Sequence, residues 1–106
     1  MTKLVADKNL ERFVKKLKEE FKDHIKEIIL FGSRGRGDYT DESDYDFILI
    51  FDEVTDELKE RIDSLIIDTM LDYGMVITDF VFTREELEKR RYEPFVINAR
   101  REGIVL

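Results

Sequence analysis

Hydrophobic positions recur along the chain with two different periods, and these periods divide it into helices and strands. Apolar residues three or four positions apart predict amphipathic helices over 8–22 and over 56–73. Apolar runs bounded by glycine or charged residues predict buried strands over 28–31, 43–51 and 75–82. A capping box at Thr83 starts a helix that ends near residue 92, and Pro94 opens a last helix over 95–102. Residues 104–106 are expected to form an edge strand.

This order of elements predicts an α/β (α+β) fold, a small mixed sheet of three to four strands flanked by helices. The helix between strands 43–51 and 75–82 supplies the crossover that parallel pairing requires. The chain has 106 residues, which is enough for one hydrophobic core and too few for two. We therefore expect a single domain over 1–106.

A glycine-rich turn follows the first strand, with the sequence Gly32-Ser33-Arg34-Gly35-Arg36-Gly37. Glycine allows the backbone to turn sharply, and the free N–H groups at the start of a following helix suit a phosphate. The Ser33 hydroxyl and the guanidinium groups of Arg34 and Arg36 are candidate further donors. A tight bend or helix cap without a ligand is the simpler alternative.

Two carboxylates, Asp44 and Asp46, stand at the start of the second strand. Side chains alternate along a strand, so both lie on one face, with Cα atoms roughly 6.6 Å apart. Desolvated like charges repel each other, and a hard divalent cation such as Mg²⁺ removes that conflict. Phosphate donors that face a metal-binding carboxylate pair indicate phosphoryl or nucleotidyl transfer. A solvated acidic loop over 38–44 is the alternative.

A third carboxylate, Asp79, interrupts the apolar strand over 75–82. A buried acid is costly unless it is paired or bound to a metal. The alternative is a residue at the strand edge that points to solvent.

The spacing between these motifs is specific, because ten residues separate Ser33 from Asp44 to give Gly-Ser-x10-Asp-x-Asp. With a strand on each side, the pattern resembles the minimal nucleotidyltransferase (MNT) family of the DNA polymerase β-like superfamily. Residues 32–37 are similar to that family's Gly-Ser-x-Ala-Arg-Gly. Gly35 stands where alanine is usual, a departure that we expect to be sterically mild.

The resemblance implies a two-metal nucleotidyltransferase site that uses ATP. Asp44 and Asp46 would bridge two Mg²⁺ ions, and Gly32 and Ser33 would hold the nucleotide phosphates and one of the ions, with Arg34 and Arg36 as further nucleotide contacts. Asp79, which matches the family's third carboxylate, would complete the second ion or accept the acceptor's proton. The acceptor hydroxyl would attack the α-phosphorus, and pyrophosphate would leave.

The resemblance also implies a partner, because stand-alone family members of this size are typically paired with a helical HEPN-type RNase toxin. The expected function is an antitoxin that transfers AMP from ATP to a tyrosine of the HEPN toxin. Two alternatives stay open. One is a non-catalytic binding module that masks the partner, and the other is a nucleotidyltransferase that modifies a small molecule.

Composition narrows the partners further. A formal net charge of −7 argues against stable nucleic-acid binding, which needs a basic face. No stretch is apolar enough to span a membrane, no signal peptide is visible and cysteine is absent, so we expect a cytoplasmic protein without thiol chemistry. We expect His24 to be a surface residue. The C-terminal arginines are expected to be solvated, with contacts to a partner or a triphosphate as the alternative, at Arg90, Arg91, Arg100 and Arg101.

Overall fold

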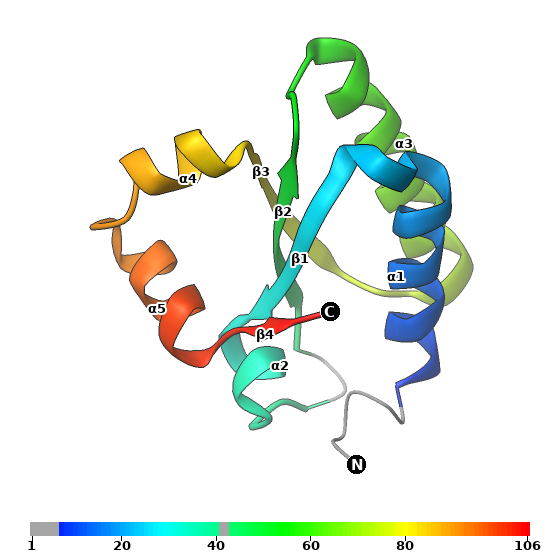
Figure 1. The fold of residues 1–106 in the computed structure, drawn as a ribbon. Coiled ribbons are helices and arrows are strands. Elements are labelled where there is room, and N and C mark those ends of the chain that lie inside the picture. The colour runs from blue at the N-terminus through cyan, green and yellow to red at the C-terminus, as the bar shows by residue number, and fades with distance from the viewer. Residues whose placement is uncertain (1–6, 41–42) are drawn as a thin grey trace.

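A computed structural model describes residues 7–40 and 43–106, and within these residues four strands form one mixed sheet in the order β3-β2-β1-β4 (Figure 1). The elements in chain order are α1 (Lys8–Phe21), η1 (Lys22–His24), β1 (Ile25–Phe31), α2 (Gly32–Arg36), β2 (Tyr45–Phe51), α3 (Asp56–Tyr73), β3 (Ile77–Phe82), α4 (Arg84–Lys89), α5 (Pro94–Glu102) and β4 (Ile104–Val105).

The sheet combines both kinds of strand pairing. β1 pairs antiparallel with β2 and with β4, whereas β2 and β3 run parallel. α3 is the crossover between the two parallel strands, as the hydrophobic pattern predicts. The α+β class and the mixed four-stranded sheet are therefore confirmed.

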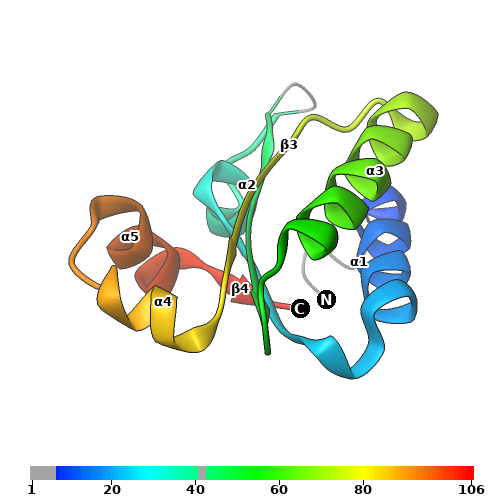
Figure 2. The same ribbon diagram turned by 90° about the horizontal axis from the view of Figure 1, so that it is seen from above.

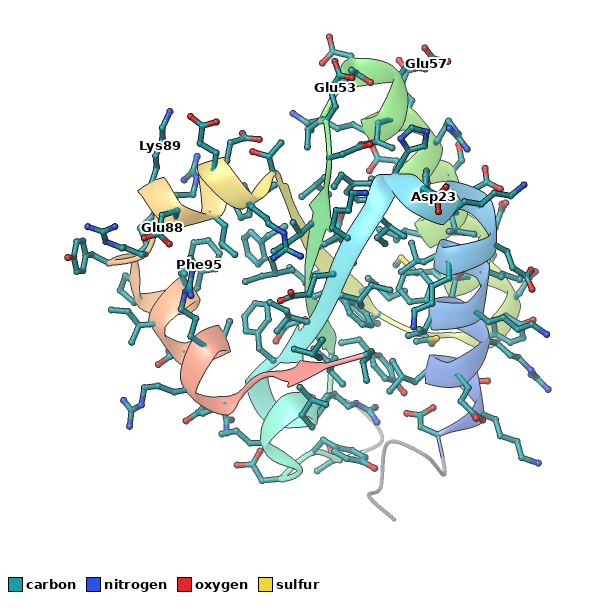
Figure 3. The ribbon with its side chains drawn as sticks, in the orientation of Figure 1. Asp23, Glu53, Glu57, Glu88, Lys89 and Phe95 are labelled. Carbon is teal, nitrogen blue, oxygen red and sulfur yellow. The ribbon has the colours of Figure 1, made fainter. Side chains whose placement is uncertain are left out.

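Helices cover both faces of the sheet and enclose two hydrophobic clusters (Figure 2). On one face α1 and α3 pack against alternate residues of β2, and the ring centroids of Phe13 and Phe47 lie 5.1 Å apart. On the other face α4 and α5 cover Ile48 and Ile50. Phe95 of α5 points toward the sheet and stacks on Phe80 of β3 with 4.6 Å between ring centroids (Figure 3). Apolar side chains on both faces explain why β2 lies inside the sheet.

Local signals in the sequence set most helix ends. The Asp7 and Thr55 side chains accept the backbone N–H groups of the third residue after each, and Thr83 forms the predicted capping box with Glu86. Gly74 ends α3 in the left-handed region with φ of 68°. α4 ends at Lys89 rather than near residue 92, because the backbone turns there with hydrogen bonds from 90 to 87 and from 91 to 88.

The charged surface agrees with the plainer of the sequence interpretations. His24 is exposed, and its Nδ1 lies 2.9 Å from Oδ2 of Asp52. Three of the four C-terminal arginines pair with glutamates: Arg90 with Glu93, and Arg91 and Arg100 with Glu88. Within the described ranges, no helix is both long and apolar enough to cross a bilayer.

Candidate active site

The glycine turn and the paired aspartates meet at one end of the sheet. α2 lies where β1 ends and β2 begins (Figure 1). Asp23, Glu53 and Glu57 lie toward the opposite end (Figure 3). Phe31, the last residue of β1, is the register partner of Asp46. Gly32 follows Phe31, so the antiparallel pairing of β1 with β2 brings the turn against the Asp46 side chain.

Gly32 and Asp46 approach so closely that only glycine fits at position 32. A Cβ atom on Gly32 would overlap Oδ2 of Asp46, and the backbone there has φ of +68°, a conformation that residues with side chains rarely adopt. Two physical constraints therefore require glycine at position 32. One is the turn itself, and the other is the space that the carboxylate occupies.

Gly35 is also packed too tightly for a larger residue, which corrects the expectation of a mild departure from alanine. A Cβ atom there would lie 2.7 Å from the carbonyl oxygen of Leu30 and 3.4 Å from that of Glu102. These carbonyls belong to β1 and to the end of α5. An alanine at position 35 would require the backbone around α2 to shift.

Asp44 and Asp46 form a carboxylate pair at the mouth of β2. Asp44 precedes the strand and is exposed, whereas Asp46 is partly buried on the strand. Burial raises the pKa of the Asp46 carboxyl above its usual range, and the nearby charge of Asp44 raises it further. This is the electrostatic conflict that the sequence predicts, and a divalent cation bound there would relieve it.

Ser33, the residue after Gly32, is partly exposed. Among the residues that the structure describes, the hydroxyl makes no hydrogen bond, while the Ser33 carbonyl accepts the N–H of Gly37 at 2.9 Å. That bond closes α2, and Gly37 takes φ of +89°. The Ser33 hydroxyl therefore remains available to a ligand at the turn.

Arg34 does not lie where the sequence analysis expects a nucleotide contact. Its side chain is only 6% exposed, and its guanidinium lies between the rings of Tyr39 and Tyr45. Because its donors are directed at Ser43 and Asp7, it is not free to bind a nucleotide. The prediction failed because a buried arginine and a phosphate-binding arginine look alike in a glycine-rich sequence.

Arg36 remains at the surface but is already paired. Its Nε donates to Asp38 at 3.2 Å and its Nη1 to Glu102 at 3.3 Å, and these carboxylates raise the pKa of the guanidinium. In this arrangement Arg36 ties α2 to the end of α5. A direct phosphate contact by Arg36 stays a prediction.

Asp79 lies on the wrong face of the sheet for the predicted carboxylate triad. Parallel pairing aligns Asp79 with Phe47, and it aligns Thr78 with Asp46. Asp79 therefore faces α3, where burial and then the charge of Asp63 raise its pKa. The described residues contain no group of three or more acidic or histidine side chains placed to hold a metal. The expected convergence of Asp44, Asp46 and Asp79 is wrong.

Thr78 is the residue that the sequence analysis missed. It is exposed and lies next to Asp46 on the same face. No sequence signal marks it, because alternation along β3 shows which residues share a face and not how β3 aligns with β2. The protein itself thus provides two acidic groups at the site, with the Thr78 hydroxyl beside them.

Comparison with known proteins supports the same class. The model of the nucleotidyltransferase domain family matches residues 10–106. A protein of Methanocaldococcus jannaschii named "putative protein adenylyltransferase" is 39% identical over 100 residues, which cover 94% of this chain and 96% of that protein. The fold and the turn-and-carboxylate site define a nucleotidyltransferase domain. This chain belongs to that family.

Two solved structures share the fold at low sequence identity. A putative nucleotidyltransferase from Sulfolobus solfataricus superposes with a TM-score of 0.58 and 21% identity, over 92% of this chain and 76% of that one. A toxin–antitoxin structure with AMP-PNP gives a TM-score of 0.61 and 18% identity, over 90% of this chain and 70% of that one.

Proposed function

We propose that this protein is a Mg²⁺-dependent adenylyltransferase that moves AMP from ATP to a tyrosine of a HEPN-type toxin and so acts as its antitoxin. In this proposal Asp44 and Asp46 hold the metal, and Gly32 and Ser33 receive the nucleotide phosphates. The observation that carries the proposal is the close approach of the Asp46 carboxylate to Gly32, where it occupies the space that a Cβ atom would take. It supports a metal-binding role for Asp46 beside a phosphate-binding role for the turn.

The donor set at this point fits a hard divalent cation. Two carboxylates offer oxygen ligands, one of them has a raised pKa because its charge is poorly solvated, and the glycine leaves the approach open. Mg²⁺ commonly binds one or two carboxylates together with substrate phosphates, so a third protein carboxylate is not required. When bound, the metal would stabilise charge that develops on the phosphate oxygens.

The proposed reaction is a displacement at the α-phosphorus of ATP. The oxygen of the acceptor tyrosine forms a bond to that phosphorus, the bond from phosphorus to the pyrophosphate oxygen breaks, and the tyrosine proton passes to solvent. Within this chain, the Ser33 hydroxyl and the backbone of the turn orient the leaving phosphates. Asp44 and Asp46 provide the negative charge that would hold the metal. Gly32 keeps the approach to Asp46 free of side-chain atoms.

Two relatives support the choice of nucleotide and partner. The Methanocaldococcus jannaschii relative is named "putative protein adenylyltransferase", which supports AMP as the transferred group and a protein as the acceptor. The toxin–antitoxin structure with AMP-PNP supports an adenine nucleotide and a toxin partner for this fold. The HEPN class of the partner and its tyrosine rest on the resemblance of Gly32-Ser33 and Asp44-x-Asp46 to the minimal nucleotidyltransferases.

The test is transfer to a purified HEPN-type protein as the candidate partner. Incubation with ATP and Mg²⁺ should increase the partner's intact mass by whole AMP units on tyrosine and abolish its RNase activity. The Asp44→Ala/Asp46→Ala double variant should slow transfer by about a thousandfold or more, because metal stabilisation is worth several kcal/mol at the transition state.

The same experiment separates catalysis from masking. A partner that keeps its mass yet loses its RNase activity, and does so equally with the double variant, would contradict the transferase proposal and support a binding module. Transfer to a small molecule with no change in the partner would support the remaining alternative.

A further inference from the structure

Arg34 is a buried charged side chain immediately next to the proposed phosphate turn. It and Thr69 are the buried polar residues of the core among those the structure describes. Burying a guanidinium is costly unless its donors are satisfied and its charge is balanced. The contacts of the Arg34 guanidinium therefore show how this cost is offset and which segments the side chain connects.

The guanidinium joins four segments of the chain. Nε and Nη2 donate to the carbonyl oxygen of Ser43 at 3.3 and 3.2 Å, in the forked geometry that arginine favours. Nη1 lies 3.6 Å from Oδ2 of Asp7, the residue that caps α1. The rings of Tyr39 and Tyr45 lie on the guanidinium, with 4.3 and 4.1 Å between Cζ and each ring centroid.

The Tyr45 side chain extends this cluster to α1. Its hydroxyl donates to Oδ2 of Asp7 at 2.6 Å. The Asp7 carboxylate therefore accepts a hydrogen bond from Tyr45 and forms an ion pair with Arg34. Burial and this hydrogen bond raise the pKa of Tyr45, which keeps the phenol protonated. The cluster is thus a connected set of hydrogen bonds, an ion pair and cation–π contacts.

These contacts determine where Asp44 lies. The Ser43 carbonyl that Arg34 binds belongs to the peptide bond between Ser43 and Asp44. On the other side of Asp44, the Tyr45 N–H donates to the carbonyl of Val76 at 2.8 Å. The Asp44 carboxylate is exposed and makes no hydrogen bond within 7–40 and 43–106. Its position is therefore set by the backbone that Arg34 anchors.

We propose that Arg34 is a positioning residue that assembles the metal site by holding Asp44 at a fixed place relative to Gly32 and Ser33. The proposal rests on the function proposed above and assigns Arg34 a role in metal binding rather than in binding the nucleotide. Arg34 belongs to α2, the segment that also carries the turn, so its bond to Ser43 links the two halves of the site directly.

The expected size of the effect follows from other metal sites, where loss of an outer-shell partner costs about 10–100-fold in metal affinity. Arg34→Lys keeps the positive charge but loses both the fork and the flat surface that stacks on the tyrosines. Tyr39→Leu removes one ring from the cluster without replacing a buried charge. Tyr39→Phe keeps that ring, so it should bind the metal more tightly than Tyr39→Leu.

The experiment is a titration of each purified protein with Mn²⁺ alone, followed by the electron paramagnetic resonance signal of free Mn²⁺. Arg34→Lys should raise the dissociation constant for Mn²⁺ by about tenfold or more. Tyr39→Leu should weaken Mn²⁺ binding by a smaller factor, and Tyr39→Phe should bind Mn²⁺ more tightly than Tyr39→Leu does. Arg61→Lys is the matched control, because Arg61 also donates to a carbonyl (Glu20, 3.1 Å) and lies over a ring (Phe21, 4.9 Å), but on α3.

The outcomes separate this inference from the proposed function. Wild-type protein that does not bind Mn²⁺ would overturn this inference, whereas the proposed function is tested separately by transfer of AMP to the partner. Wild-type binding that Arg34→Lys and Tyr39→Leu retain unchanged would overturn the positioning role alone. Circular dichroism checks the fold, and if Arg34→Lys does not fold, the difference between Tyr39→Leu and Tyr39→Phe decides.

Discussion

Asp46 and Asp79 lie in neighbouring strands of one sheet, and each is a partly buried carboxylate whose pKa is raised first by burial. Their surroundings nevertheless differ completely. Asp46 abuts the backbone of Gly32 and lies near Asp44, at the end of the sheet where the chain turns. Asp79 faces α3 and Asp63 on the other side of the sheet.

The difference shows that the alignment of two strands, and not the acidic residue itself, decides whether a carboxylate reaches the site. Side chains alternate along a strand, so moving the register by one residue exchanges its two faces. In β3 the residue aligned with Asp46 is Thr78, and Asp79 is one position too late. The predictions below test this contrast, beginning with the largest expected effect.

Gly32→Ala should disrupt the surroundings of Asp46 and leave those of Asp79 unchanged. A Cβ atom would overlap the Asp46 carboxylate, and the left-handed backbone adds roughly 1–2 kcal/mol of strain. We expect loss of metal-dependent nucleotide binding and a melting temperature lower by about 5–10 °C. Calorimetry and thermal denaturation measure the two effects.

Gly74→Ala is the matched control for this variant. Gly74 has the same φ of +68°, but nothing lies within 4 Å of the position its Cβ would take. The control should lose stability through backbone strain alone and keep nucleotide binding. Equal behaviour of the two variants would show that the contact between Gly32 and Asp46 is unimportant.

The sequence predicts this half of the site well, because its determinants are local. Gly32-Ser33 directly follows β1, and Asp44-x-Asp46 lies at the start of β2. These two strands are consecutive in the chain and pair antiparallel, so the spacing of the motifs already defines the geometry. The helix cap at Thr83 is local as well, and the structure confirms it.

The incorrect predictions for Asp79 and Arg34 have a different cause. The placement of both residues depends on segments that are far apart in the chain. The face of the sheet on which Asp79 lies depends on the register between β2 and β3, the strands that α3 connects. The alternation of side chains along β3 does not determine this register. The tight packing of Gly35 is a local exception, because the nearest atom to its Cβ position is the carbonyl oxygen of Leu30. The burial of Arg34 depends on Asp7 and on two tyrosine rings, so a local motif cannot predict it.

Thr78→Asp should strengthen the site by placing a third carboxylate on the face of Asp46. We expect about tenfold tighter Mn²⁺ binding, because an added carboxylate increases the charge and the number of oxygen ligands. The same charge should lower the melting temperature in EDTA through repulsion of Asp46. Thr78→Asn is the neutral control, and equal Mn²⁺ affinity of the Asp and Asn variants would argue against the observed register.

Asp46→Asn and Asp79→Asn should each stabilise the metal-free protein slightly at neutral pH. The folded state holds both protons more tightly than the unfolded chain, so the ionised carboxylates reduce stability as the pH rises from the usual aspartate value through the raised pKa. The melting temperature in EDTA at pH 7 should rise by no more than about 5 °C.

The gain should disappear in acid, below about pH 3.5, where both carboxyls are protonated even in the unfolded chain. Melting curves across this range check the sign. A destabilised Asp46→Asn protein at neutral pH would instead indicate that Asp46 accepts a structural hydrogen bond.

The most direct test of the account compares these two asparagine variants as ligand-binding proteins. Isothermal calorimetry with α,β-methylene ATP, whose α–β bridge cannot be cleaved, measures affinity with Mg²⁺ and with EDTA. The account predicts that Asp46→Asn loses the Mg²⁺-dependent part of the affinity, whereas Asp79→Asn keeps it within about twofold, because only Asp46 faces the turn. Loss of the Mg²⁺ dependence in Asp79→Asn, with Asp46→Asn unaffected, would contradict the assignment of the site to the Gly32 end of the sheet.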